Sequence, residues 1–146
     1  MESDAIPAVL AEIPFMHALP DSTRNDLTRI IMDVSSLETI EEGTVVFTQG
    51  EPGTDIGYFL LEGDFEVLKS GAMTLQKSGP ELLGEMKQFN PVGLRTATVN
   101  ALTSLDVLTF KWTELHSTLE AGLSADAFQA VEQALENYAW EHFTEQ

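Results

Sequence analysis

Residues 82–99 read LLGEMKQFNPVGLRTATV, and this run interrupts a long series of short predicted strands. Gly84 opens the run after two leucines, and one predicted helical turn follows before the chain returns to a strand. A glycine followed by a short helix exposes backbone N–H groups, which suit an anion. Arg95, the last of the chain's three arginines, shares the run with Lys87 and Thr96. These three side chains are the available partners for a phosphate, so the run predicts an anion site.

The region around this run, residues 38–110, carries apolar residues with a period of two. Short strands with turns every 8–12 residues are typical of an antiparallel sandwich or barrel. Eight of the ten glycines lie between residues 43 and 84 of this region, at 43, 50, 53, 57, 63, 71, 79 and 84, where positive φ or tight corners are expected. The predicted strands cover residues 44–47, 58–61, 65–68, 73–75, 96–99 and 107–110.

The first 37 residues instead carry apolar side chains at helical spacing. Pro7, Pro14 and Pro20 divide this zone, because each proline removes an N–H donor and fixes φ. Asp21 or Ser22 is placed to cap the segment that follows. The zone predicts two or three short helices.

After residue 112 the helical period returns. Thr113 is placed to cap a short helix through Glu120, which Ala121 and Gly122 break, and Ser124 to cap a second helix that runs to about residue 142. The second helix carries one apolar stripe, which either packs on the barrel or pairs with a second copy of the chain as a homodimer. The stripe consists of Phe128, Val131, Leu135 and Tyr138.

Composition and charge exclude several classes of protein. A chain of 146 residues with 43% apolar residues suits one domain, and the absence of cysteine excludes disulfides and thiolate chemistry. The net charge of −17 disfavours nucleic acid and anionic membranes as partners. With no long apolar run and no secretory signal, the sequence predicts a cytoplasmic protein.

Catalytic and metal sites are not predicted. His17, His116 and His142 share no metal-ligand spacing, which disfavours the alternative of a metal-dependent barrel enzyme. No pair of carboxylates stands out as acid and base, and no nucleophile elbow or Gly-Lys-Ser/Thr phosphate loop occurs. We therefore expect no catalytic residue, no metal and no enzyme activity.

The run from Gly84 to Ala97 resembles the phosphate-binding cassette of the cyclic nucleotide-binding domain family. In that family Gly-Glu is followed, across a short helix, by Arg, a small residue and Ala; here the spacing from Glu85 to Arg95 is ten, as in the bacterial catabolite activator branch. The resemblance covers about residues 13–142. It includes the entry helix at 13–20, the glycine turn pattern at 42–53 and the central strand and turn at 58–63.

The resemblance implies a mainly β fold with flanking helices. Its centre is an antiparallel β-roll, which is a double-stranded β-helix of jelly-roll type, with N-terminal helices, a short cassette helix and two C-terminal helices. Residues 1–12 are interpreted as an N-terminal extension, and residues 13–146 as a single cyclic nucleotide-binding domain. Whether the extension folds on the domain is left open.

A ligand site follows from the same resemblance, with cAMP or cGMP as ligand and no further cofactor. Glu85 would accept a hydrogen bond from the ribose 2′-hydroxyl, Arg95 would pair with the phosphate oxygens, and the hydroxyl of Thr96 is the family position that helps to hold a syn guanine. The implied ligand-binding set is Gly84, Glu85, Met86, Lys87, Arg95, Thr96 and Ala97. On the last helix, the residues that could cover the base include Asn137, Tyr138 and Trp140.

Two functions remain open for this scaffold. The first is a sensor that binds a cyclic purine mononucleotide and signals to an unidentified protein partner through its C-terminal helix. The alternative is a degenerate fold that acts as a protein-interaction module without nucleotide. It is motivated by Lys87 and Gln88, which replace small or apolar residues of the family, and by the net charge, which opposes the approach of a phosphate.

Overall fold

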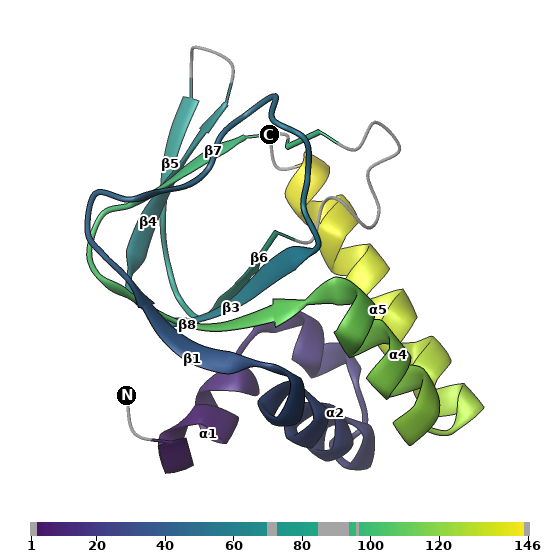
Figure 1. Ribbon diagram of the computed structural model, residues 1–146. Helices are drawn as coiled ribbons and strands as arrows, with labels where there is room; N and C mark the ends of the chain where they lie inside the picture. The colour runs from purple at the N-terminus through teal and green to yellow at the C-terminus, as the bar shows by residue number, and fades with distance from the viewer. Residues whose placement is uncertain (1–2, 70–72, 85–93, 96, 145–146) are drawn as a thin grey trace.

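The computed structural model describes residues 3–69, 73–84, 94–95 and 97–144. Two antiparallel sheets face each other and form a roll, and the helices pack against one of them (Figure 1). In spatial order, the first sheet holds β1 (Ser36–Ile40), β8 (Leu105–Lys111), β3 (Ile56–Glu62) and β6 (Glu81–Leu83). The second holds β2 (Val45–Phe47), β7 (Thr98–Ala101), β4 (Asp64–Lys69) and β5 (Met73–Ser78).

The helices lie before and after the strands in sequence, as predicted. They are η1 (Ser3–Ala5), α1 (Ile6–Leu10), η2 (Pro14–Ala18), α2 (Asp21–Val34), α4 (Trp112–Gly122) and α5 (Ala125–Thr144). None of the helices within the described ranges is both long enough and apolar enough to cross a membrane. The antiparallel roll with flanking helices confirms the predicted fold class, while the predicted cassette helix falls within residues 85–93, outside the described residues.

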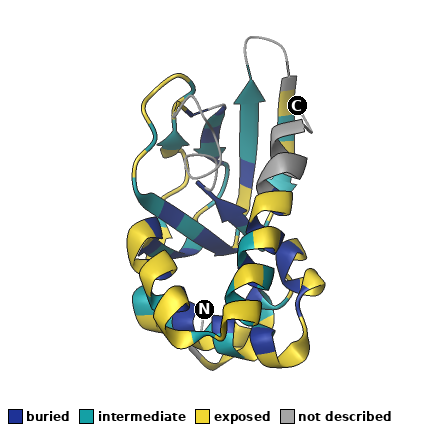
Figure 2. Ribbon diagram, turned by 90° about the vertical axis from the view of Figure 1, so that its right-hand side faces the viewer, coloured by how far each residue is buried: buried dark blue, intermediate teal, exposed yellow. Residues whose placement is uncertain are grey.

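The first sheet separates two hydrophobic cores. Along β3 the side chain of Leu60 points into the roll, whereas Phe59 and Leu61 point toward the helices. Figure 2 shows buried residues along the strands and on the inner sides of the helices. Each fully buried leucine or phenylalanine contributes about 1.5–3 kcal/mol of transfer free energy, so burial on both faces anchors this sheet as the centre of the molecule.

The N-terminal segment packs on the domain. Ile6 is 2% exposed and Leu10 is fully buried, and both belong to the core on the helix side of the first sheet. The sequence left open whether residues 1–12 fold on the domain, and for α1 the structure answers that they do.

Two of the three predicted helix caps are wrong. Helix α2 begins at Asp21 after Pro20, so neither Asp21 nor Ser22 is its N-cap. Helix α4 begins one residue before Thr113, and the cap comes from a distant loop: Asp55 accepts hydrogen bonds from the Thr113 N–H at 3.1 Å and from its hydroxyl at 2.6 Å.

The third predicted cap, at the start of α5, is confirmed. The hydroxyl oxygen of Ser124 accepts a hydrogen bond from the N–H of Ala127 at 3.2 Å. This bond satisfies one of the four N–H groups that the first turn of a helix leaves without an intrahelical partner.

Strands β1 and β6 were not predicted. The residues of β1 are nearly all exposed, so the strand lacks the alternation of buried and exposed side chains that marks a half-buried strand. Strand β6 has only three residues and directly precedes Gly84. Both strands are held by pairing with longer neighbours, β8 and β3, which a local pattern does not reveal.

Gly57 lies inside β3 and not in a turn, contrary to the expectation for the glycines of this region. A Cβ at this position would lie 2.5 Å from Cζ of Phe110 and 2.9 Å from Nε1 of Trp112. The glycine therefore allows two aromatic rings of the following elements to lie against the strand.

We predict that Gly57→Ala lowers the free energy of unfolding by about 1–3 kcal/mol, because the added methyl group overpacks this contact. Denaturant unfolding measures the change. Gly122→Ala is the matched control: its Cβ would meet only Ile30, at 3.3 Å, and it should change stability little. Equal effects of the two substitutions would contradict this role of Gly57.

Candidate functional site

Arg95 is fixed to the turn between β2 and β3 by its backbone. Its N–H donates to the carbonyl of Glu51 at 2.9 Å, and its carbonyl accepts from the N–H of Gly50 at 3.0 Å. The neighbouring residue Leu94 forms an isolated bridge with Pro52. The glycine turn and the arginine, both singled out in the sequence, therefore lie side by side.

The side chain of Arg95 is buried, with 7% of the residue exposed. Its Nη1 donates to the carbonyl oxygen of Gly84 at 3.2 Å, and its Nη2 donates to the hydroxyl of Thr54 at 3.4 Å. The guanidinium carbon lies 4.1 Å from the centroid of the Phe47 ring, within reach of a cation–π interaction. The structure thus brings Arg95 to Gly84, as predicted.

Gly84 adopts a backbone conformation that requires glycine. Its φ is +91°, and a Cβ would lie 3.0 Å from Cζ of Phe47 and 3.1 Å from the carbonyl oxygen of Ile56. Its carbonyl oxygen accepts a second hydrogen bond from Nε1 of Trp112 at 3.2 Å. The turn that opens the predicted cassette is therefore held from two sides.

A cavity of about 240 Å³ lies beside Arg95. This is slightly below the roughly 300 Å³ at which small-molecule sites begin. Polar and apolar groups contribute about equally to its wall, and the polar groups include the carboxylate of Glu51 as well as the guanidinium of Arg95. The wall is formed by Val46, Phe47, Thr48, Glu51, Pro52, Thr54, Ile56, Tyr58 and Arg95.

Tyr58 shares the wall of this cavity with Arg95. Burial and the carboxylate of Glu38 raise the pKa of its hydroxyl above the ordinary 10.0, and the positive charge of Arg95 opposes this shift. Its ring centroid lies 5.8 Å from that of Phe47. The two aromatic rings and the guanidinium form one wall of the cavity.

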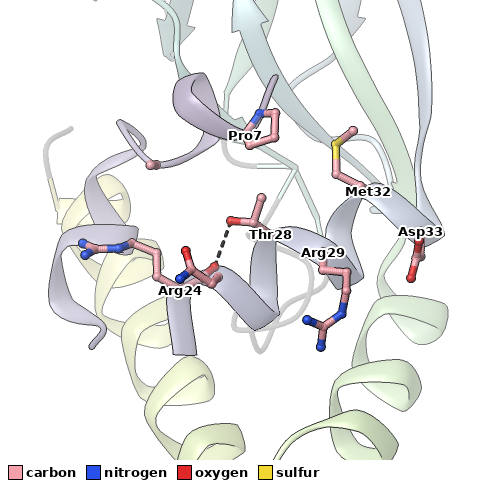
Figure 3. Close-up of a pocket in the computed structure, with 8 residues that line it drawn as sticks. Pro7, Arg24, Thr28, Arg29, Met32 and Asp33 are labelled. Atoms are coloured by element: carbon pink, nitrogen blue, oxygen red, sulfur yellow. Dashed lines mark hydrogen bonds between the residues drawn. The ribbon is translucent and has the colours of Figure 1, made fainter. Parts of the chain in front are cut away.

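A second, larger cleft of about 400 Å³ lies beside α1 and α2 (Figure 3). Arg24 and Arg29 line it, but they extend in different directions and each pairs with an aspartate of the same helix: Arg24 with Asp21, and Arg29 with Asp26 at 3.1 Å. The cleft therefore lacks convergent charge, and the cavity at Arg95 is the better candidate.

The remaining predicted ligand-binding residues divide into described and undescribed ones. Ala97 is 8% exposed and directly precedes β7, so its side chain packs inside the domain. Glu85, Met86, Lys87 and Thr96 lie outside the described residues, and their roles stay predictions.

The predicted base-covering residues lie on α5. Asn137 is exposed and accepts a hydrogen bond from Gln133 at 3.0 Å. Tyr138 is 2% exposed, and its hydroxyl accepts from the N–H of Leu82 at 3.2 Å, so in this conformation it belongs to the core. The side chain of Trp140 is outside the described part. Contact of any of them with a base stays a prediction.

Four residues that interact with Arg95 or Gly84 were missed at the sequence level: Phe47, Thr54, Tyr58 and Trp112. Phe47 and Tyr58 are strand residues. A period of two predicts on which face of the strand each side chain lies, but not how far that side chain lies from Arg95. Thr54 follows Gly53 of the turn pattern, and that adjacency was an available signal.

Among the described residues, no group of three or more histidine or acidic side chains is arranged to hold a metal.

Comparison with known proteins identifies the family. The family model of the cyclic nucleotide-binding domain matches residues 37–121, which run from within β1 to within α4 and include Gly84, Arg95 and the residues that line the cavity. The chain belongs to this family.

Individual relatives agree with this assignment. Over 103 residues the chain is 37% identical to a cAMP-dependent protein kinase regulatory subunit from Yarrowia lipolytica (strain CLIB 122 / E 150), covering 68% of this chain and 26% of that protein. The chain spans about a quarter to a third of the length of the curated relatives it matches.

Solved structures share the fold. The structure of PKAR CBD2 bound to Sp-2Cl-cAMPS has a TM-score of 0.72 at 14% identity, covering 97% of this chain and 86% of that one. The N-terminal domain of a transcriptional regulator from Streptomyces coelicolor A3(2) has a TM-score of 0.63 at 28% identity, covering 92% and 94%.

The pKa of Tyr58 provides a test of the site's electrostatics. Because Arg95 lowers this pKa, Arg95→Gln should raise it further, whereas Arg29→Gln should leave it unchanged. The phenolate absorbance during a pH titration, compared with that of a Tyr58→Phe variant, measures it. Since the folded-state pKa is raised, the contribution of Tyr58 to stability is complete below about pH 10 and is lost as the pH rises through the folded-state value. If the pKa of Tyr58 is unchanged or lowered in Arg95→Gln, the charge of Arg95 does not act on the Tyr58 hydroxyl.

Proposed function

We propose that this chain is a regulatory module that binds a cyclic purine mononucleotide, cAMP or cGMP, with Arg95 as the phosphate ligand. One observation carries the proposal: a buried guanidinium lies beside a cavity, between a glycine turn of positive φ and the wall of the β-roll. Membership of the cyclic nucleotide-binding domain family supports the ligand class.

Exchange of hydrogen-bond partners explains how a phosphate would bind. The carbonyl of Gly84 and the hydroxyl of Thr54, which accept from Arg95, are both neutral oxygens. A phosphate brings to the guanidinium a full negative charge, which these neutral oxygens lack, and the fork of N–H donors fits two phosphate oxygens at once. A cyclic phosphate in the cavity would therefore compete well for the same donors.

The rest of the ligand is assigned by resemblance. Glu85 accepts from the ribose 2′-hydroxyl, the amides of Met86 and Lys87 point at the phosphate, and Thr96 contacts phosphate or guanine. The names of the relatives agree with this ligand: one is a regulatory subunit of a cAMP-dependent kinase, and another is bound to Sp-2Cl-cAMPS.

The chain acts by binding and not by catalysis in this proposal. Ligand capture orders the cassette, and the end of α5 then closes over the base, so that the two positions of α5 form a two-state element biased by the ligand. A protein partner in the cytoplasm receives the signal. The alternative of a homodimer through the α5 stripe is not supported, because Phe128, Val131, Leu135 and Tyr138 pack on the core of their own chain.

Isothermal titration calorimetry with cAMP and cGMP tests the proposal. The wild-type chain should bind at least one of them, and Arg95→Gln should weaken binding by about tenfold to a hundredfold, because it removes a charge-assisted contact of about 1.5–3 kcal/mol. Arg29→Gln, in the other cleft, is the matched control and should bind like the wild type.

Other ligands separate the alternatives in the same experiment. Cyclic CMP, cyclic UMP and 5′-AMP show whether the purine and the cyclic phosphate are recognised. If no cyclic nucleotide binds the wild type, the proposal is wrong and the nucleotide-independent interaction module is favoured. If binding survives in Arg95→Gln at full strength, the ligand lies elsewhere.

Substitution of Thr96 tests the choice of base. If its hydroxyl holds a syn guanine, Thr96→Ala should weaken cGMP by about five- to tenfold, as expected for the loss of one hydrogen bond, and cAMP by less. Thr96→Ser keeps the hydroxyl and should restore the affinity for cGMP. Equal losses for both nucleotides in Thr96→Ala would show that the hydroxyl does not read the base.

A further inference from the structure

The carbonyl oxygen of Gly84 is shared by two donors from different parts of the chain. Nη1 of Arg95 and Nε1 of Trp112 both lie 3.2 Å from it, and both side chains are buried. A carbonyl oxygen has two lone pairs, so these two bonds use its full capacity. If one of these hydrogen bonds is weakened, the carbonyl oxygen accepts more strongly from the remaining donor.

Trp112 is also the first residue of α4. Its backbone N–H donates to the carbonyl of Asp55 at 2.8 Å, and the carboxylate of Asp55 caps the helix through Thr113. The residue before Asp55 is Thr54, whose hydroxyl accepts from Nη2 of Arg95. Two short hydrogen-bonded routes thus run from the guanidinium to the first turn of α4.

The indole ring has little freedom to move. Trp112 is 4% exposed, and its ring packs edge-on against Phe110 with centroids 4.9 Å apart. The bare Cα of Gly57 provides the space for the indole N–H, since a Cβ there would lie 2.9 Å from Nε1. The donor is therefore held in one place while the arginine side chain opposite it exchanges partners.

We propose that Trp112 is a positioning residue of the ligand site, and that its indole N–H links the state of Arg95 to helix α4 through the Gly84 carbonyl. The part concerning the ligand rests on the proposed function. When a phosphate takes the Nη1 donor, the Gly84 carbonyl keeps only the indole donor, and that bond shortens. By reciprocity, a change at the start of α4 alters the affinity of the site.

A double-mutant cycle tests the link without any ligand. Trp112→Phe removes the indole N–H and keeps an aromatic ring, and Arg95→Met removes the guanidinium donors and keeps a long side chain. Each single variant leaves the carbonyl one donor, whereas the double variant leaves it buried with neither. The unfolding equilibrium constant of the double variant should exceed the product expected from the singles by about tenfold.

Additive single effects would overturn the link. Trp112→Phe combined with Arg29→Met is the control cycle, because Arg29 lies in the other cleft, and its effects should be additive. If the double variant does not fold, a spectroscopic measurement on the Arg95→Met variant tests the link instead. In a Trp140→Phe background the chain has one tryptophan, and Arg95→Met should move the Trp112 indole N–H signal downfield in a ¹H–¹⁵N spectrum. An unmoved signal would also overturn the proposal.

Addition of cAMP or cGMP to the wild-type chain tests the ligand-dependent part, with calorimetry run on the same sample and the Trp140→Phe spectrum used only to assign the Trp112 indole signal. The expected result is a saturable downfield shift of the indole signal and, in Trp112→Phe, an affinity about fivefold lower than in the wild type. Heat of binding without any indole shift overturns the inference and leaves the proposed function standing. If no nucleotide binds, the proposed function fails, and the ligand-free cycle decides whether Trp112 positions the Gly84 turn.

Discussion

A guanidinium group held away from water is the constraint on which the other features depend. Removing an ion from water costs several kcal/mol unless hydrogen bonds and packing offset it. For Arg95, a cation–π contact with Phe47 and hydrogen bonds to the Gly84 carbonyl and the Thr54 hydroxyl offset this cost. The positive φ of Gly84 and the backbone pairing at Glu51 place these acceptors correctly. In a chain with a net charge of −17, such a protected cation is also a place where an anionic ligand is locally favoured.

The arrangement of the two cores explains why the site and the helices are so close. The sheet β1–β8–β3–β6 has one face in the roll and the other against the helices, so it separates them by a single layer. Gly84 directly follows β6, and Trp112 directly follows β8. Their hydrogen bond therefore joins the turn at Gly84, whose carbonyl also accepts from Arg95, to α4 across the end of this sheet. Only the Gly84 carbonyl lies between the guanidinium of Arg95 and the indole N–H of Trp112, the first residue of α4.

Much of this site could be predicted from a single motif. The glycine-led turn and the arginine ten residues after Glu85 are close in sequence, and resemblance to a family cassette joined them correctly. Phe47 and Tyr58 were not found because a period of two assigns a side chain to a face of the sheet and says nothing of its place along the roll. Trp112 was not found because it is separated from Gly84 by 28 residues and reaches it only through the tertiary fold. The predicted cap of α4 failed for a related reason, since its cap comes from Asp55.

The central claim is that the guanidinium of Arg95 receives the phosphate of a cyclic nucleotide. The chain has three arginines, so their side-chain N–H signals can be followed individually in a ¹H–¹⁵N spectrum during a titration with cAMP and cGMP, with Arg95→Lys giving the assignment. The account predicts that the Arg95 signal moves saturably while those of Arg24 and Arg29 stay in place. Binding of the nucleotide with the Arg95 signal unmoved would contradict it.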